Sequence, residues 1–318
     1  RTSVGFFMTK TFSKDPKTYP ELLQKLESDG LKITDQTAAL RHLKQISYYR
    51  LKGYGLAFRQ YDETGKRLST YQPNVELVTL IHMSMIDAEL RSLILAAIDR
   101  IEVEVRNVIN HELSIKYNSS HWFLDENLFQ SSDQFKHQDF LGKIKQFTAK
   151  KADAGSEKEK LRETFIHHYY QAYVTPEYPP CWMIAEVLPL GSWSKLYEHL
   201  VQSKDRKQVS KQFDLSPELL ESWLHALTYL RNVCAHQGRL FNRTFAFPPK
   251  QGKKAPLKTQ HQLYNYICIL FLFLKEFNHE YDWLERIEAV LKKCPNELLK
   301  FYGFDENWLE KDEDYWMN

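Results

Sequence analysis

The sequence predicts a mostly α-helical protein, and three observations support this fold class. No Gly or Pro occurs from Val75 to Tyr117, and the apolar residues of this stretch recur at helical spacing. Pro217 stands where a helix can begin, and helical periodicity continues from it to about Ala235. Residues that favour strands gather only between about 50 and 72, so we expect little β-structure.

Residues 8–74 predict a small N-terminal unit that resembles a helix-turn-helix. Pro20 stands at the first position of a short helical pattern, and Gly30 ends that pattern. Thr34 or Asp35 can then cap a second short helix, since both side chains accept hydrogen bonds from free backbone N–H groups.

A β-hairpin is predicted to follow these two helices. The strand-like runs cover residues 56–61 and 67–71, and the turn between them contains Gly65. The hairpin completes the N-terminal unit.

The remaining chain is predicted to form one helical core over residues 75–280. A polar, lysine-rich insertion interrupts it at about 118–160, and an apolar helix is expected over 262–278. Residues 281–318 are acidic and contain Trp, and we expect a packed helix with a charged end there.

The composition indicates a globular protein of a reducing compartment. The 318 residues include 43% hydrophobic residues and only four Cys, which are too far apart for a disulfide framework or a zinc site. The longest apolar run, residues 267–274, is too short to span a membrane. We therefore expect a cytoplasmic protein with no membrane association, no metal and no cofactor. The first seven residues lack a methionine, so we expect an artificial addition before a natural start at Met8.

A net charge of +2 conceals an uneven distribution of charge. Residues 1–60 hold 11 basic and 5 acidic side chains, a balance of +6, and residues 201–260 hold 11 and 4, a balance of +7. Residues 281–318 hold 5 and 10, a balance of −5. Two basic segments therefore remain candidates for binding a polyanion.

The pattern Arg-Asn-Val-x-x-His occurs twice, at residues 106–111 and 231–236, each toward the end of a predicted helix. Arg-x4-His alone arises easily by chance, as it does at Arg162 and His167. Two copies that also share Asn and Val are unlikely to be accidental. The simpler interpretation, in which a helix-end Arg and His make capping and surface contacts, stays open.

These residue types suit chemistry on RNA. Arg presents a fork of donors that matches phosphate oxygens, and His exchanges protons near neutral pH. RNA supplies its own nucleophile, the 2′-hydroxyl, so cleavage needs an acid or base, a cation at phosphorus and a strand held in line. Asn and His are four residues apart and share one helix face, whereas Arg and His differ by about 140°.

Three segments resemble the Abi-like (abortive infection, AbiD/AbiF-type) family of the HEPN superfamily of α-helical ribonucleases. They are Leu90-Arg91 with residues 101–106, residues 229–243, and residues 46–54. The resemblance covers roughly residues 19–275.

This resemblance implies a HEPN-like helical core and a metal-independent endoribonuclease that leaves 2′,3′-cyclic phosphate and 5′-hydroxyl ends. It also implies a toxin of anti-phage defence, restrained by an antitoxin that is a small noncoding RNA in some relatives. HEPN sites usually form where two motifs face each other across a dimer, whereas two motifs in one chain could form one composite site. The catalytic residues that carry over are Arg231, Asn232 and His236 from the second motif, and Arg106, Asn107 and His111 from the first.

Two basic segments with interleaved aromatic residues are candidates for binding RNA, since Lys and Arg contact phosphates and aromatic rings stack on bases. Their aromatic residues could equally pack into the core. The first cluster comprises Arg41, Lys44, Tyr48, Tyr49, Arg50, Lys52 and Arg59. The second comprises Arg239, Arg243, Lys250, Lys253, Lys254 and Lys258, with Phe241, Phe245 and Phe247 among them.

Other candidates and functions are weaker. His167 and His168 lack acidic or Cys neighbours at metal-ligand spacing, and Cys234 lies on a different helix face from His236. A non-catalytic protein that holds a small structured RNA is the alternative function, and a helical scaffold is a third. The sequence leaves open whether two chains form a homodimer.

Overall fold

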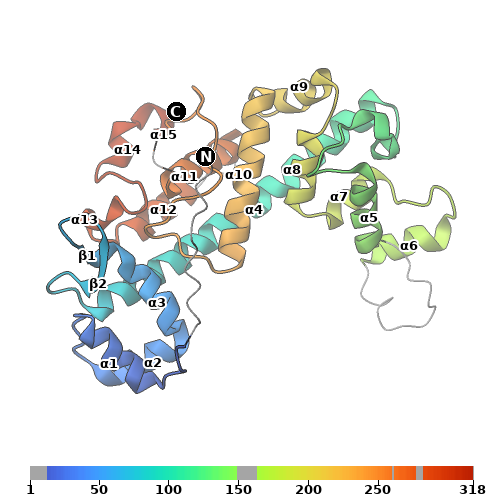
Figure 1. Ribbon diagram of the computed structural model, residues 1–318. Helices are drawn as coiled ribbons and strands as arrows, with labels where there is room; N and C mark the ends of the chain where they lie inside the picture. Colours follow the sequence, from blue (N-terminus) through green and yellow to red (C-terminus); the bar gives the residue numbers. More distant parts are fainter. Residues whose placement is uncertain (1–12, 149–162, 260, 277–281, 318) are drawn as a thin grey trace, which may run out of the picture. The chain divides into compact units, whose positions relative to one another are not determined.

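The computed structural model describes residues 13–148, 163–259, 261–276 and 282–317. These residues are mostly α-helical and contain one two-stranded antiparallel sheet near the N-terminus, which confirms the predicted fold class (Figure 1). The chain divides into two compact units, residues 1–85 and 86–318. The expected addition at 1–7 and the part of the insertion at 149–160 lie outside the described residues.

The first helix begins one residue before Pro20, and the second begins after the predicted cap Asp35. In α1 (Tyr19–Ser28) the Thr18 side chain accepts a hydrogen bond from the backbone N–H of Glu21, and the Glu21 carboxylate accepts one from the N–H of Thr18. In α2 (Gln36–Ile46) the cap is Asp35, which accepts from Ala38 N at 2.9 Å.

The hairpin is shorter than its sequence predicts. After α3 (Tyr48–Tyr54), the segment η1 (Gly55–Phe58) forms a 3₁₀ turn, so β1 is only Arg59–Tyr61. β2 (Arg67–Tyr71) matches the predicted run and pairs antiparallel with β1. A Cβ atom added at Gly55 would lie 2.6 Å from the Tyr71 hydroxyl, so the turn brings backbone directly against this ring.

Arg59 lies in the core of the first unit. Its side chain is 2% exposed, and its guanidinium carbon lies 3.6 Å from the centre of the Tyr71 ring. Arg59 Nη1 faces Asp29 Oδ2 at 3.6 Å, and the other oxygen of Asp29 accepts from Lys25 Nζ at 2.7 Å. Burial raises the pKa of Tyr71 to about 12. The predicted RNA contact at Arg59 therefore disagrees with its buried position.

The Gly- and Pro-free stretch forms one continuous helix, α4 (Leu77–Lys116). Its last thirty-one residues belong to the second unit, because that unit begins at Ile86. Within the second unit the buried positions Leu90, Ile94, Ile101 and Val105 keep helical spacing.

The predicted insertion contains structure of its own. Two 3₁₀ turns, η2 (Trp122–Leu124) and η3 (Glu126–Leu128), precede α5 (His137–Thr148). The remaining short helices of the second unit are α6 (Thr164–Ala172), α7 (Cys181–Val187), α8 (Leu190–Glu198) and α9 (Ser203–Lys211).

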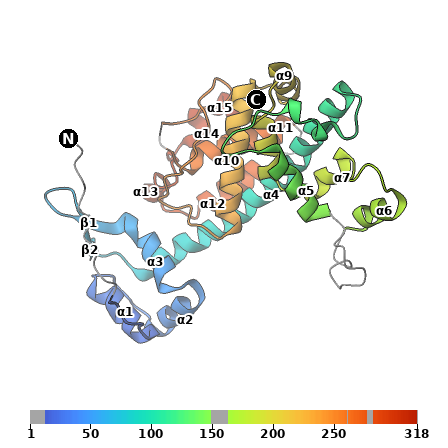
Figure 2. The same ribbon diagram turned by 45° about the vertical axis from the view of Figure 1, so that its right-hand side comes forward.

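The helix predicted after Pro217 contributes many side chains to the core of the second unit. α10 (Pro217–Ala235) has the predicted bounds, and Ser216 caps it by accepting from Leu219 N. It packs against α8, α9 and α11 (Leu263–Glu276), and α9 and α11 can be followed beside it in Figures 1 and 2. Gly191 of α8 permits the closest approach to α10, because a Cβ atom there would meet the Thr228 methyl group at 3.1 Å.

The acidic C-terminal segment packs into the second unit. It forms α12 (Trp283–Leu291), α13 (Asn296–Leu299), α14 (Trp308–Lys311) and α15 (Glu313–Met317). Trp283 Nε1 donates to Leu93 O of α4 at 3.1 Å, and the side chains of Trp308 and Trp316 are buried. The expected packed segment is thus present.

We predict that Arg59→Met destabilises the protein by about 3 kcal/mol, because it leaves the buried Asp29 carboxylate with only one cationic neighbour. Urea denaturation followed by circular dichroism measures this change. Lys44→Met is the control, since Lys44 is exposed and a surface change costs about 0.5 kcal/mol or less. Equal losses in the two variants would contradict a structural role for Arg59.

Candidate functional site

The second motif occupies the end of α10. Its Arg231 is half-buried, whereas Asn232 and His236 are exposed. His236 directly follows the last helical residue, and its backbone N–H donates to Asn232 O at 3.0 Å. Val233 and Cys234 point into the core, so the motif presents Arg, Asn and His at the surface of the second unit.

Cys234 does not act as a nucleophile near neutral pH. Burial raises the pKa of its thiol to about 12, so the thiolate is scarce at pH 7. This agrees with the expectation that Cys234 and His236 form no catalytic pair.

A cavity of about 350 Å³ lies beside the second motif. Arg231 and Asn232 contribute to its wall from α10, residues near the start of α8 form another part, and α5 adds a lysine. The complete lining is Lys143, Pro189, Leu190, Gly191, Ser192, Thr228, Arg231 and Asn232. No lining residue is acidic, so the cavity favours an anion.

The first motif lies on α4 and differs from the second in the state of its arginine. Arg106 Nη2 forms an ion pair with Glu186 Oε2 of α7 at 2.7 Å, and its side chain is only 13% exposed. Asn107 and His111 are exposed. Within the described residues, no ion pair or side-chain hydrogen bond involves Arg231. Only the second arginine is therefore free to bind an anion.

Glu102 of α4 lies near the arginines of both motifs. Its Oε1 accepts a hydrogen bond from Leu190 N at 2.8 Å. Burial raises the pKa of Glu102 above its ordinary value, and the charges of Arg231 and Arg106 oppose this rise. The charges of both motif arginines therefore act on this one carboxylate.

The two histidines do not meet within one chain. Arg91 Nη1 of α4 donates to Gly238 O at 3.3 Å, which places the residues after His236 beside this part of the helix. His111 lies twenty residues further along the same continuous helix. At a rise of 1.5 Å per residue, Arg91 and His111 are about 30 Å apart along the helix axis. The expected composite site within one molecule therefore lacks a close pair of histidines.

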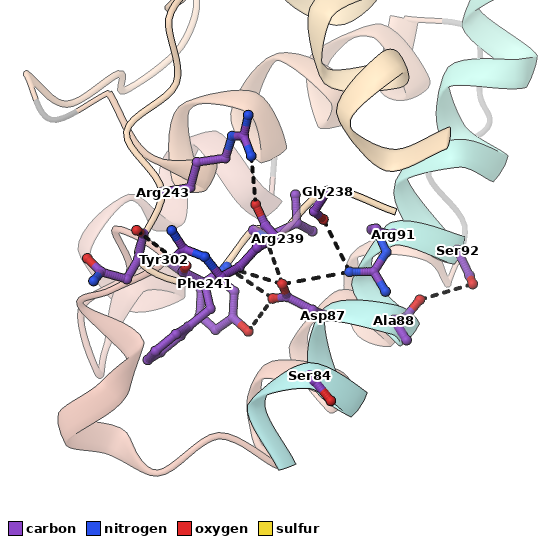
Figure 3. Close-up of polar contacts among 12 residues, drawn as sticks. Ser84, Asp87, Ala88, Arg91, Ser92, Gly238, Arg239, Phe241, Arg243 and Tyr302 are labelled. Atoms are coloured by element: carbon purple, nitrogen blue, oxygen red, sulfur yellow. Dashed lines mark hydrogen bonds and ion pairs between the residues drawn. The ribbon is translucent and has the colours of Figure 1, made fainter. Parts of the chain in front are cut away.

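A buried carboxylate fixes the chain just beyond His236 (Figure 3). Asp87 of α4 is 0% exposed and accepts hydrogen bonds from Leu240 N at 2.6 Å, Phe241 N at 3.1 Å and the Tyr302 hydroxyl at 2.7 Å. Arg91 lies 3.7 Å away on the next turn of α4. Asp87 thus ties the segment after the motif to α4 and to the C-terminal segment.

Three cations of the second basic cluster have structural partners. Arg239 Nη1 donates to Phe241 O and to Asn242 O, and Arg243 donates to Arg239 O and to the Tyr229 hydroxyl. Lys258 Nζ lies 3.0 Å from Asp305 Oδ2 and 4.0 Å from the centre of the Tyr264 ring. These side chains hold their own segment together.

The other lysines of this cluster lie at the surface. Lys254 pairs with Asp214, whereas Lys250 and Lys253 are exposed. Phe241 and Phe245 are buried, so the core-packing alternative holds for these two rings. Phe247 is partly exposed and lies 5.2 Å from Tyr229, centre to centre.

The N-terminal cluster also divides into buried and exposed members. Arg41 and Lys44 are exposed, and Tyr49 is 87% exposed on α3. Tyr48, Arg50 and Lys52 are half-buried, and Lys52 Nζ lies 5.8 Å from the centre of the Tyr48 ring. With Arg59 in the core, the remaining six residues form the candidate surface.

The described part of the chain contains neither a candidate metal site nor a helix that could span a membrane. No group of three or more His, Cys, Asp or Glu side chains is arranged to hold a metal ion. None of the described helices combines the length and the apolar character that crossing a bilayer requires. All four cysteines are buried and unpaired.

Comparison with known proteins identifies the family. The family model described as Abi-like protein matches residues 41–242, which is more than half of the chain. Neither the search of curated proteins nor the search of solved structures finds a match. The chain therefore belongs to the Abi-like protein family, and this membership suggests a role in abortive infection. Both Arg-Asn-Val-x-x-His motifs lie within the matched residues.

Sequence reasoning missed four residues that the structure brings to the second motif. Asp87 and Arg91 have the i,i+4 spacing of a helical ion pair, and this signal was readable. Glu102 stands four residues before Arg106, with the same spacing and the same charge pairing. Lys143 lies in a lysine-rich segment, and nothing in the sequence distinguishes it from its neighbours.

We predict that Asp87→Asn destabilises the protein by about 3 kcal/mol, because it leaves Arg91 buried without its counter-charge. Tyr302→Phe removes one hydrogen bond to a charged acceptor and costs about 1 to 2 kcal/mol. Urea denaturation measures both changes, and hydrogen exchange should report faster opening of residues 238–241.

The control for this pair is Asp305→Asn, at an exposed carboxylate that Lys258 and Lys311 share. Its cost should stay within about 1 kcal/mol. A loss in Asp87→Asn no larger than in this control would show that Asp87 does not organise the segment.

We predict that Glu102→Gln removes a pH-dependent loss of stability. A carboxyl whose pKa is raised in the folded state stabilises the fold below its unfolded pKa of about 4.3, and this contribution is lost as pH rises through the folded pKa. We subtract the unfolding free energy of the wild type from that of Glu102→Gln. This difference should increase between about pH 4.5 and about pH 7.5. A difference that decreases with pH would contradict the burial of this carboxyl.

Proposed function

We propose that this protein is a metal-independent endoribonuclease toxin of anti-phage abortive infection, with its catalytic residues at the end of α10. The observation that carries the proposal is the state of the second motif. Arg231 is unpaired within the described residues and lines a cavity without carboxylates, and His236 is exposed one turn beyond Asn232. The resemblance to HEPN ribonucleases and the family membership support the same assignment.

The reaction is a transesterification within the RNA strand. The 2′-oxygen forms a bond to phosphorus and the bond to the 5′-oxygen breaks, which leaves a 2′,3′-cyclic phosphate and a 5′-hydroxyl. One group takes the proton of the 2′-hydroxyl, and another gives a proton to the departing 5′-oxygen. His236 performs one of these transfers, and Arg231 stabilises the charge that develops on the phosphate oxygens. Asn232 shares a helix face with His236 and can orient its ring.

A second proton-transfer group then comes from another chain. His111 lies about 30 Å along α4 from Arg91, which contacts the segment after His236, so His111 does not complete the acid–base pair within one molecule. A homodimer that brings two copies of the second motif face to face supplies a second His236. This arrangement is the usual one among the HEPN proteins that the sequence resembles.

The N-terminal unit is the candidate surface for the antitoxin. Tyr49 is almost fully exposed, and Arg41 and Lys44 lie exposed on the preceding helix. Such a mixture of cations and an exposed ring binds folded or unpaired RNA. We place the protein in the cytoplasm, where RNA is present and where its four free cysteines stay reduced.

We predict that purified protein cleaves RNA in EDTA and that His236→Ala lowers the cleavage rate by at least about a hundredfold, the usual contribution of acid–base catalysis. Cleavage products should carry cyclic-phosphate ends, detectable by their resistance to ligation until the ends are opened. The same substitution should relieve growth inhibition in cells.

The matched control is His111→Ala, which alters the same motif pattern at an exposed helical position. We expect it to retain most of the cleavage activity. Unchanged cleavage in His236→Ala would refute the assignment. An equal loss in both variants would show that the two motifs act at one site, against the separation that α4 imposes.

One observation also favours the alternative function, a non-catalytic RNA-binding protein. The exposed Tyr49 surface needs no catalytic group to hold a structured RNA. Salt-dependent binding of RNA without cleavage, in protein with an intact second motif, would support this alternative.

A further inference from the structure

The cavity beside α10 offers a binding site that the motif alone does not define. We propose that it holds a backbone phosphate of the RNA strand, and that Lys143 of α5 is an RNA-binding residue of this site. The inference rests on the proposed function, since it names how the substrate of that site is held. Lys143 comes from the segment that the sequence predicts as an insertion.

The charges of the cavity indicate an anionic ligand. Lys143 and Arg231 provide two cations, and the side-chain amide of Asn232 provides a neutral donor. Within the described residues neither cation has an ion-pair partner, whereas Arg106 on α4 is bound to Glu186. Two cations that face one cavity repel each other unless an anion lies between them, so a phosphate stabilises this arrangement.

The carboxylate of Glu102 contacts the lining residue Leu190 but does not itself line the cavity. Glu102 accepts a hydrogen bond from Leu190 N, and burial raises its pKa in spite of the two arginines. Leu190 is also the first residue of α8, so the Glu102 carboxylate is bound at the N-terminus of this helix.

The position of the cavity favours a phosphate within a strand over a free anion. Asn232 lines the cavity, and His236 lies four residues further along the same chain, which is about 6 Å of helix. A strand that presents one phosphate to His236 therefore passes the mouth of the cavity. A volume of about 350 Å³ exceeds what one small anion fills and lies within the range of ligand sites.

Lys145 provides a matched control on the same helix. It lies two residues from Lys143, carries the same charge and is exposed. It does not line the cavity, and its Nζ pairs with Glu177 Oε1 at 2.7 Å. If only overall charge matters, removing either lysine should weaken RNA binding equally. If the cavity binds a phosphate, only the removal of Lys143 should weaken RNA binding.

The test uses the full chain and a fluorescent single-stranded oligonucleotide of about twelve nucleotides with 2′-O-methyl groups, which the protein cannot cleave because the nucleophile is blocked. Anisotropy over a series of salt concentrations gives the affinity and its salt dependence. We expect Lys143→Ala to weaken binding by up to about fivefold and to lower the salt slope by about 0.7. Lys143→Arg should keep both values, and Lys145→Ala should match the wild type.

Three outcomes would overturn the proposal. The first is a wild-type affinity and salt slope in Lys143→Ala, and the second is an equal loss in Lys143→Ala and Lys145→Ala. The third is weaker binding of inorganic phosphate by Lys143→Ala with unchanged binding of the oligonucleotide, which would assign the cavity to free anions.

The failure of the proposed catalysis gives a different result. A wild-type protein that cleaves no RNA, but whose oligonucleotide binding depends on Lys143, would refute the ribonuclease and support the phosphate site. A wild-type protein that cleaves RNA, but whose oligonucleotide binding does not depend on Lys143, would support the ribonuclease and refute the phosphate site.

Discussion

The buried carboxylate of Asp87 is the contact on which the surroundings of the second motif depend. One side chain of α4 satisfies two backbone N–H groups beyond His236 and a hydroxyl of the C-terminal segment, with Arg91 as its counter-charge. A charge so deeply buried is tolerated only when every one of these partners is present. The exposed histidine therefore precedes a segment that two distant parts of the chain, α4 and the C-terminal segment, hold in place.

The two motifs have the same sequence pattern but different surroundings. Glu186 neutralises Arg106, and nothing comparable occupies Arg231 within the described residues. Lys143 adds a second positive charge beside Arg231, whereas the first motif gains a negative one. A repeated pattern thus provides one arginine that lines a cavity and one arginine that joins α4 to α7.

Sequence reasoning predicted the elements well where local chemistry decides them. Pro217 and the cap before it define the start of α10, and the Gly- and Pro-free stretch became α4. It failed at Arg59, because the burial of a cation depends on Asp29 and Tyr71, which meet it only in the fold. Sequence reasoning also missed Lys143, because only the fold brings this one lysine among several to the same cavity as residues of α8 and α10. Hydrophobic periodicity predicts which face of a helix is buried, but not which other helix packs against that face.

The unbroken course of α4 has a consequence for how this chain tolerates insertions. Asp87 and His111 belong to one rigid rod, so one added residue between them turns everything beyond it by about 100°. Glu102 would then leave Leu190, and Arg106 would leave Glu186. Only a change of about seven residues, close to two full turns, preserves the facing of both ends. Length variation in this family should therefore gather in the loops around α5 and be absent from the middle of α4.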